Sequence, residues 1–510
     1  MRFNKFVWEL YKQSKRGQKA IARFSYLDEK FIEEWCRSME FDFDDEEKEQ
    51  FQASDFSMNI PELIRDSVSG ITFKEQDAAT NHYTKTLVEN FIPFKFADKT
   101  GKMIEVAGFP YEETDGYDYV AAVSLGLYQA QPNYFLPYNF RTKFNQVEEI
   151  HTQFNIPLPA VPGKNDKDGR SLYYIEINRL WQEFRLHHGL SPIEMCAFLY
   201  DFAQEFITPM NADDLPSPSK AWLITGGSWD IETVDNATPN LVIRWSGNPG
   251  IRRGDILMMY LVSPRKSIGS IWRACSDGFI DPFFHYHGTV WICNPVKTEP
   301  VTFAELKQHS LLSQKPAVRA NFQGSSGRTA FTFEEYEAIL KIMQKKGQNL
   351  TLLPRLPLNE SLPEAILLNE RDVEVQLIEP FIKRLDYKNS DWVRQMPVKM
   401  GRGECYYPDY AFAPKTRRGE ESAKMVLESK FQLSAQKAFE EAFFQTKSYA
   451  LRLQSKIMAM AAKEGVWVFP KHKGTFDIKN YIQKSWAELA HPDGFHEVLI
   501  WIGRDKVLKK

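Results

Sequence analysis

Three ionisable residues near the C-terminus, Asp409, Glu428 and Lys430, lie in segments that otherwise have the composition of buried β-strands. Strands that only build a core rarely carry charged side chains on an inward face, because burying an isolated charge is costly. Two carboxylates held together repel each other unless a cation lies between them. Oxygen ligands with room for water suit Mg²⁺, which can activate a bound water and neutralise charge on a phosphoryl group. The sequence therefore predicts a Mg²⁺ site with Asp409 and Glu428 as ligands.

The segments around these residues explain how they could meet. The stretches "YPDYAFA" and "MVLESKF" read as strands, and the polar turn "PKTRRGEESA" joins them into a predicted hairpin. Asp409 lies early in the first strand, and Glu428 and Lys430 lie late in the second, two residues apart on one face. In a hairpin these positions converge at one end of the sheet. Lys430 would there orient an attacking water or stabilise a pentavalent phosphorus.

The rest of segment 366–510 alternates between helices and strands. Apolar residues recur at helical spacing in "NERDVEVQLIEPFIKRL", and a long helix is predicted at about 434–455. We expect strands at "WVRQMPV", "GVWVF" and "EVLIWI", and a further helix at "IKNYIQKSWAEL". The hairpin would then lie in a sheet that has a helix before it and another after it.

This pattern resembles the PD-(D/E)xK nuclease superfamily, with Pro408-Asp409 and Glu428-Ser429-Lys430 as the matching motifs. The following helix carries Gln445 and Tyr449 in a Q-x3-Y pattern, one turn apart on one face. Cleavage subunits of type I restriction enzymes have a similar pair behind their active site. The resemblance implies that Gln445 and Tyr449 support catalysis.

The predicted helix that precedes the hairpin is similar to the leading helix of the same restriction nucleases. Glu370 takes the place of the carboxylate on that helix, and Glu374, one turn further on, is a weaker candidate. Asp386 stands where those nucleases usually have a glycine, in the turn that ends the helix. That departure affects a turn and not the predicted chemistry.

Residues 219–345 are rich in short strands separated by Gly, Pro, Asn and Ser. The strands that we expect are "KAWLITGG", "NLVIRW", "GDILMMYLVS", "SIGSIWRAC" and "GTVWICNPV", followed by helices at "TFAELKQHSLL" and "TFEEYEAILKIMQKKG". This segment resembles an EVE domain, a PUA-like barrel related to YTH domains. The matching parts are Trp222, Trp245 with Asn248, and Gly254-Asp255 before the strand to Tyr260.

Relatives of that kind hold a modified base in an aromatic pocket, and indole faces are good stacking platforms for an unpaired base. We predict that Trp245 lines such a pocket, because it follows a strand and precedes a Gly/Asn/Pro loop, and that Trp229 in "GGSWD" is second. Ser228, Asp230 and Asn248 could supply hydrogen bonds to base edges. Trp222, Trp272 and Trp291 lie within predicted strands and are more simply explained as core residues.

Residues 1–215 combine predicted helices with aromatic-rich loops and contain no recognisable catalytic constellation. The predicted helices are "EKFIEEWCRSM", "IPELIRDSV", "IEINRLWQEFRLHHG" and "SPIEMCAFLYDFAQEFI". Acidic side chains outnumber basic ones over 1–218, whereas basic ones are in excess over 219–345 and 366–510. That excess suggests a polyanionic partner, although chance variation in surface charge would explain it as well.

The sequence also limits the location of the protein and its cofactors. It has five scattered cysteines, no apolar run long enough to cross a bilayer, and no signal peptide at its start. We expect a cytoplasmic protein without a membrane partner. No G-x4-G-K-[ST] loop is present, so no NTP is expected.

Taken together, these patterns predict a multidomain α+β protein. It would have a mostly helical domain over 1–215, a PUA-like (EVE) barrel over 219–345 and a PD-(D/E)xK nuclease fold over 366–510. The resemblances imply a Mg²⁺-dependent endonuclease that cuts DNA with modified bases in antiviral defence. Two alternatives are an RNA-directed nuclease and a non-catalytic binding subunit of a defence complex. Cutting both strands needs two active sites or two visits, so a homodimer is plausible.

Overall fold

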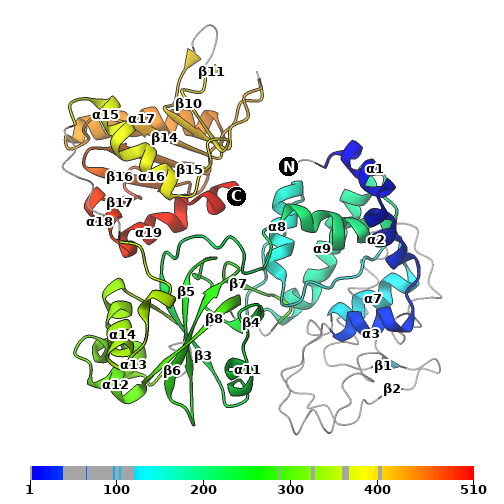
Figure 1. Cartoon of the computed structure of the whole chain (residues 1–510). Coiled ribbons are helices and arrows are strands. Elements are labelled where there is room, and N and C mark those ends of the chain that lie inside the picture. The colour runs from blue at the N-terminus through cyan, green and yellow to red at the C-terminus, as the bar shows by residue number, and fades with distance from the viewer. Residues whose placement is uncertain are drawn as a thin grey trace. The chain divides into compact units, whose positions relative to one another are not determined.

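The computed structural model describes residues 3–37, 65, 96–97, 103–104, 120–284, 288–322, 328–358, 367–399, 405–417 and 419–509 (Figure 1). Its contacts divide the chain into two compact units. The first contains 1–211, 242–250 and 275–292, and the second contains 212–241, 251–274 and 293–510. Within the described residues, the chain mixes helices with two larger sheets. None of the described helices is both long and apolar enough to cross a membrane.

The described residues before 212 are mainly helical and surround an aromatic-rich core. The helices are α1 (Lys5–Gln13), α2 (Lys15–Ser25), α3 (Glu29–Arg37), α7 (Val120–Ala130), α8 (Phe144–Phe154), α9 (Lys167–His188) and α10 (Pro192–Ala197). Short strands β1 (Phe96–Ala97) and β2 (Met103–Ile104) pair with each other. The predicted capping box of Ser191 and Glu194 is present at the start of α10. The helix predicted at 60–68 lies outside the described residues except for Arg65, which is helical.

A curled, half-barrel sheet follows, with strand order β4-β8-β6-β5-β3-β9 and with β7 paired to β8. The five strands predicted here are confirmed as β3 (Ala221–Gly226), β4 (Ile243–Ser246), β5 (Ile256–Leu261), β6 (Ser267–Ala274) and β8 (Gly288–Thr302). Both predicted helices are confirmed as α12 (Phe303–Gln308) and α14 (Phe333–Lys345). Elements that were not predicted are β7 (Phe279–Ile280), β9 (Thr329–Phe331), α11 (Ile231–Asp235) and α13 (Pro316–Arg319).

The C-terminal part is a second sheet with helices on both faces. Its order is β10-β13-β14-β15-β16-β17, formed by β10 (Trp392–Arg394), β13 (Tyr410–Phe412), β14 (Met425–Ser429), β15 (Ile457–Ala462), β16 (Gly465–Pro470) and β17 (Ile482–Lys484). Strands β13 and β14 form the predicted antiparallel hairpin. Helix α17 (Gln436–Arg452) then connects β14 to its parallel neighbour β15. A separate small pair consists of β11 (Val398–Lys399) and β12 (Cys405–Tyr406).

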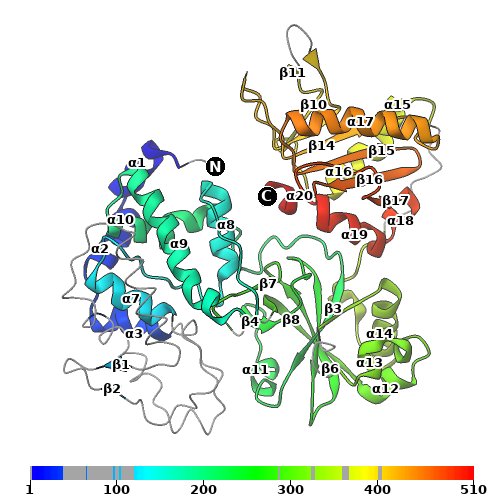
Figure 2. The same cartoon turned by 180° about the vertical axis from the view of Figure 1, so that it is seen from behind.

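The leading helix is continuous but changes its pitch. It consists of α15 (Glu370–Val373), a π-helical turn at Glu374–Ile378, and α16 (Glu379–Arg384). Pro380 has no N–H to donate to the carbonyl four residues before it, which favours a wider turn at this point. The apolar side of this helix packs on one face of the sheet, and α17 covers the other face (Figures 1 and 2).

Two predictions for the end of the chain are wrong, and one strand was not predicted. The predicted helix at 478–489 is split, because residues 482–484 pair with β16 and a capping box of Ser485 and Glu488 starts the new helix α18 (Trp486–Ala490). The predicted strand "EVLIWI" lies inside α19 (Pro492–Ile502), whose buried residues Phe495, Val498, Leu499 and Ile502 recur at helical spacing. Strand β15, "IMAMAA", was not predicted, because its alanines and methionines have little strand propensity and it is buried on both faces. Helix α20 (Arg504–Lys509) ends the chain.

Asp386 occupies a left-handed position at the end of α16, with φ of 67°. Its N–H donates to the carbonyl of Lys383, and the N–H of Tyr387 donates to the carbonyl of Ile382, the pattern of a Schellman motif. This position favours glycine, since a side chain in the left-handed region is strained. Asp386 therefore stands at a position where glycine would adopt the same backbone without strain.

We therefore expect Asp386→Gly to stabilise the fold by about 1 kcal/mol. Burial raises the pKa of Asp386, and the negative charge of Asp505 raises it further, so the native carboxyl adds an electrostatic penalty. Urea denaturation of the native chain, Asp386→Gly and Asp386→Ala would measure the effect. Alanine removes the charge but keeps the strain, so equal gains for both variants would contradict the backbone explanation.

Candidate active site

The hairpin places Glu428 next to Asp409. Strand β13 pairs with β14 so that Tyr410 is opposite Leu427, and extending this register by one residue sets Asp409 opposite Glu428. Leu427 packs with the leading helix on one face of the sheet, whereas Val426 packs with α17 on the other. Glu428 therefore faces α17, as the alternation of side chains along a strand requires. The register thus sets Asp409 beside Glu428, and Lys430 contacts Glu428 at 3.1 Å, whereas the carboxylate oxygens that lie within 4.8 Å of one another are those of Asp409, Glu370 and Glu374.

Glu428 is buried, and its two carboxylate oxygens have different surroundings. Oε1 accepts hydrogen bonds from Lys430 Nζ at 3.1 Å and from Gln445 Nε2 at 2.8 Å. The Gln445 amide also donates to the hydroxyl of Tyr449 at 3.1 Å, so the predicted Gln/Tyr pair lies directly behind Glu428. Oε2 is buried without a hydrogen bond from any residue that the structure describes. A buried carboxylate oxygen in that condition is costly, and a bound cation would satisfy it.

The charges around Glu428 set its protonation. Burial raises the pKa of Glu428 to about 7, the nearby charge of Asp409 acts in the same direction, and Lys430 partly offsets both. Burial alone would lower the pKa of Lys430, but Glu428, Glu370 and Asp409 outweigh it and hold that pKa above its ordinary value. In the metal-free site, Lys430 therefore carries a positive charge at neutral pH. A group with a pKa near neutrality beside a charge partner is typical of functional sites.

Asp409 reaches across the end of β14 to Ser429. Its Oδ2 accepts from the Ser429 N–H at 2.8 Å and from the Ser429 hydroxyl at 2.9 Å. The same hydroxyl lies 3.2 Å from Glu370 Oε1 and 3.1 Å from Glu374 Oε1. One ligand oxygen each from Glu370, Glu374 and Asp409 lies within 4.8 Å of the others. Both helix carboxylates singled out in the sequence thus lie at the site.

The donor set suits a hard divalent cation. Asp409 and Glu428 would hold Mg²⁺. Glu370 has a carboxylate oxygen within 4.8 Å of one of Asp409, so it could add a third oxygen ligand. Glu370 makes no ion pair with a described residue, and the unsatisfied Oε2 of Glu428 gives an independent reason for a cation. The residues present therefore fit the metal that the sequence predicts.

Two residues of the site were not singled out from the sequence. Ser429 occupies the variable position of the Glu-x-Lys motif, so the motif carries no signal for it. Arg394 lies on β10, and its guanidinium forms ion pairs with Glu374 and, at 2.8 Å, with Glu379. Arg394 is far from both partners in the sequence, so no local pattern indicates these ion pairs. They depend on the pairing of β10 with β13.

The predicted base-binding residues lie in different environments. Trp229 is 77% exposed in the turn before α11, and its indole covers Gly227 so closely that a Cβ there would clash. Asp230 accepts a hydrogen bond from the Gly227 N–H at 2.7 Å, which fixes this turn, and Ser228 lies within it. Trp229 is thus an exposed aromatic surface on a rigid turn.

The prediction that Trp245 follows a strand is wrong. This residue is the third of β4, opposite Val290, and is buried. Asn248 lies in the next turn and accepts a hydrogen bond from the Gly250 N–H at 2.8 Å. The core assignment is confirmed for Trp222 and Trp272, which are buried in strands, and Trp291 is partly buried against the first core.

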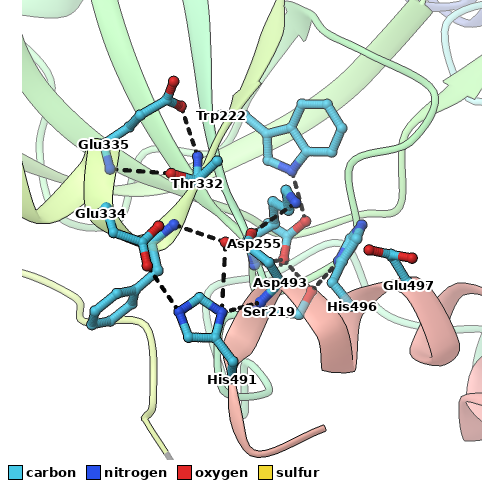
Figure 3. Close-up of polar contacts among 12 residues, drawn as sticks. Ser219, Trp222, Asp255, Thr332, Glu334, Glu335, His491, Asp493, His496 and Glu497 are labelled. Carbon is cyan, nitrogen blue, oxygen red and sulfur yellow. Dashed lines mark hydrogen bonds and ion pairs between the residues drawn. The ribbon is translucent and has the colours of Figure 1, made fainter. Parts of the chain in front are cut away.

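A second polar cluster joins α19 to the start of β3 within the second unit (Figure 3). The Ser219 hydroxyl lies 2.8 Å from Asp255 Oδ1 and 3.0 Å from His496 Nδ1, and Trp222 Nε1 donates to Asp255 Oδ2. In hydrolase triads the aspartate orients the histidine, whereas here it contacts the serine. All three residues are buried, and burial lowers the pKa of His496 to about 3. The cluster is therefore structural.

Comparisons with known proteins leave the family open. No protein-family model matches the chain, and no curated protein matches it. The NMR structure of Rpa0253 from Rhodopseudomonas palustris is similar at 23% identity, covering 25% of this chain and 94% of that one, with a TM-score of 0.20. The crystal structure of Atu2648 from Agrobacterium tumefaciens is similar at 18% identity, covering 27% and 99%, with a TM-score of 0.21. At these TM-scores neither likeness bears on function.

Proposed function

We propose that the chain is a Mg²⁺-dependent endonuclease that cuts DNA carrying modified bases, and that it acts in restriction of foreign DNA. The observation that carries the nuclease assignment is the environment of Glu428. This buried carboxylate has one unsatisfied oxygen, lies opposite Asp409, and is held on its other oxygen by Lys430 and Gln445. The arrangement agrees with the resemblance of the sequence to PD-(D/E)xK nucleases.

The residues would divide the chemistry between them. Mg²⁺ held by Asp409 and Glu428 would supply an activated water and neutralise charge on the phosphate. Lys430, whose pKa is held above its ordinary value, would present a permanent positive charge to the developing phosphorane. Gln445 fixes the Glu428 carboxylate by hydrogen bonding, and the Tyr449 hydroxyl in turn contacts the Gln445 amide. These two residues orient a ligand and do not react.

The reader function is proposed for the curled sheet, which would correspond to the EVE-like segment. Trp229 is the feature that supports it best, because an exposed indole on a fixed turn can stack on a base that has left the duplex. Trp245 and Asn248 remain proposed pocket residues. Stacking alone accepts every base, so hydrogen bonds from Ser228, Asp230 or Asn248 would have to select the modification.

The test is a digest of matched DNAs with Mg²⁺ or with EDTA. The DNAs would be unmodified, cytosine-methylated, hydroxymethylated, glucosylated and adenine-methylated, with structured RNA in parallel. Cutting confined to one modified DNA would support both the nuclease and the reader. Cutting of RNA alone would instead favour an RNA-directed enzyme. No cutting of any substrate would overturn the nuclease proposal for the isolated chain.

We expect Trp229→Ala to lower the preference for the modified DNA by about 10- to 100-fold, since stacking contributes about 1–3 kcal/mol per base. Cleavage of unmodified DNA at high enzyme concentration should change little, because Trp229 is remote in sequence from the hairpin. Trp229→Phe, which keeps an aromatic face, is the matched control and should retain most of the preference. An unchanged preference in Trp229→Ala would remove Trp229 from the proposed pocket.

A further inference from the structure

We infer that Glu374 does not bind the cation and instead acts as an ion-paired anchor that orients Asp409 through the hydroxyl of Ser429. The inference rests on the proposed function in one respect, because it takes Asp409 as a Mg²⁺ ligand. Position alone does not separate the two roles, since one carboxylate oxygen each of Glu370, Glu374 and Asp409 lies within 4.8 Å of the others. The partners of each carboxylate separate them.

The Ser429 hydroxyl is the centre of this group. It has one hydrogen to donate, yet carboxylate oxygens of Asp409, Glu374 and Glu370 lie 2.9, 3.1 and 3.2 Å from it. Ser429 is fully buried, so water does not reach the hydroxyl from bulk solvent. At least two of these carboxylates must therefore be balanced by some other positive charge.

Glu374 already has that balance. Its Oε2 is paired with the guanidinium of Arg394 and, at 2.6 Å, with that of Arg371, while Oε1 faces the serine. Its side chain is nearly buried, which strengthens both ion pairs. A Mg²⁺ ion at Glu374 would have to displace the guanidinium groups or tolerate their repulsion. Glu374 is thus a poor metal ligand.

The arginine that neutralises Glu374 is itself fixed. Arg394 also pairs with Glu379 at 2.8 Å, and its guanidinium lies 5.4 Å from the centre of the Tyr410 ring. Tyr410 is fully buried, is the first residue of β13 and directly follows Asp409, so this support belongs to the sheet. The chain of contacts runs from β10 through Glu374 and Ser429 to Asp409. Among the described residues, no arginine forms an ion pair with Glu370 or Asp409, and both share the positive charge of Lys430 with Glu428.

The anchor predicts a separation between metal affinity and rate. Residues that hold a metal ligand in place typically change metal affinity or activity by about 10- to 100-fold when they are replaced. The charge-neutral double variant Glu374→Gln/Arg394→Gln should keep the Kd for Mg²⁺ within about threefold and slow cleavage about tenfold. Ser429→Ala should slow cleavage by about 10- to 100-fold and raise that Kd only severalfold, because the backbone N–H still holds Asp409.

Isothermal titration of the full chain with MgCl₂ alone, followed by cleavage rates at saturating Mg²⁺, tests the inference. Asp409→Asn provides the scale for losing a ligand, and Glu379→Gln provides the control, since it removes a carboxylate from Arg394 without touching Ser429. If the double variant loses as much Mg²⁺ affinity as Asp409→Asn, Glu374 is a ligand and the inference fails. It also fails if Ser429→Ala leaves both quantities unchanged.

The Mg²⁺ titration separates this inference from the proposed function. A chain that binds Mg²⁺ with the expected order of variants, but cuts no nucleic acid, would retain the anchor and lose the nuclease assignment. A chain that cuts DNA while the double variant loses Mg²⁺ would retain the nuclease and lose the anchor. Failure of the native chain to bind Mg²⁺ would overturn both.

Discussion

Replacing Asp409 with asparagine is expected to slow Mg²⁺-dependent cleavage at least about a thousandfold, which corresponds to about 4 kcal/mol of transition-state stabilisation. Asparagine has nearly the same shape but no charge to hold the cation. It can still accept the hydrogen bonds that Ser429 donates to Asp409, so the strand end should keep its structure. Binding of DNA in the absence of metal should be unchanged or slightly tighter, because one negative charge is removed from the site.

Lys430→Met is the variant to compare with Asp409→Asn. It removes the ammonium that contacts Glu428 but leaves both proposed ligands, so cleavage should fall steeply while Mg²⁺ still binds. Asp477→Asn makes the same chemical change as Asp409→Asn on an exposed carboxylate in the segment between β16 and β17, and it should have no effect. Rates measured under single-turnover conditions with saturating Mg²⁺ would decide. Normal cleavage by Asp409→Asn would show that the active site lies elsewhere.

Local patterns in the sequence predict the centre of the site well. The hairpin of β13 and β14, the two-residue spacing of Glu428 and Lys430, and the one-turn spacing of Gln445 and Tyr449 are each set within a few residues. Side-chain alternation in strands and the helical repeat are short-range properties, so they carry over directly into the fold. These contacts are the ones that the structure reproduces.

The parts that could not be predicted depend on packing between distant segments. Strand β15 is identified as a strand by its place between β14 and β16, since its composition of Ala, Met and Ile would suit a buried helix equally well. The apolar run within α19 was ambiguous for the same reason, and the helix follows from Pro492 at its start and from its contacts with the sheet. The ion pair of Arg394 with Glu374 also requires the tertiary fold.

The tryptophans show a different limit. Trp229 and Trp245 were both placed in loops, because Gly, Asn and Pro follow or flank them. Composition near a strand end does not say whether the strand stops before or after the aromatic residue, and β4 continues through Trp245 to Ser246. Exposure cannot be obtained from such a pattern at all, whereas the structure separates the exposed Trp229 from the buried Trp245.

Glu428→Gln is expected to abolish cleavage and, in the same protein, to stabilise the metal-free fold at alkaline pH. Burial raises the pKa of Glu428 to about 7 from an ordinary value of 4.5, so the folded state holds a proton that the unfolded chain releases. The stability that this proton provides is complete below about pH 4.5 and is lost as the pH rises through 7. Above pH 8 the ionised carboxylate destabilises the metal-free fold by about 3 kcal/mol.

Glutamine mimics the protonated carboxyl and has no charge to bury, so the variant should lack this pH dependence. Urea denaturation with EDTA at pH 5 and at pH 8.5 would measure the free energy of unfolding of both proteins. Subtracting one value from the other cancels the contribution of every other titrating group. The difference in unfolding free energy between Glu428→Gln and the unmutated chain should be larger at pH 8.5 than at pH 5. Mg²⁺ should reduce this difference, because it should stabilise only the unmutated chain, by binding its folded state. Parallel stabilities at the two pH values would mean that Glu428 stays ionised and balanced without a metal, and the case for a cation at its unsatisfied oxygen would then be lost.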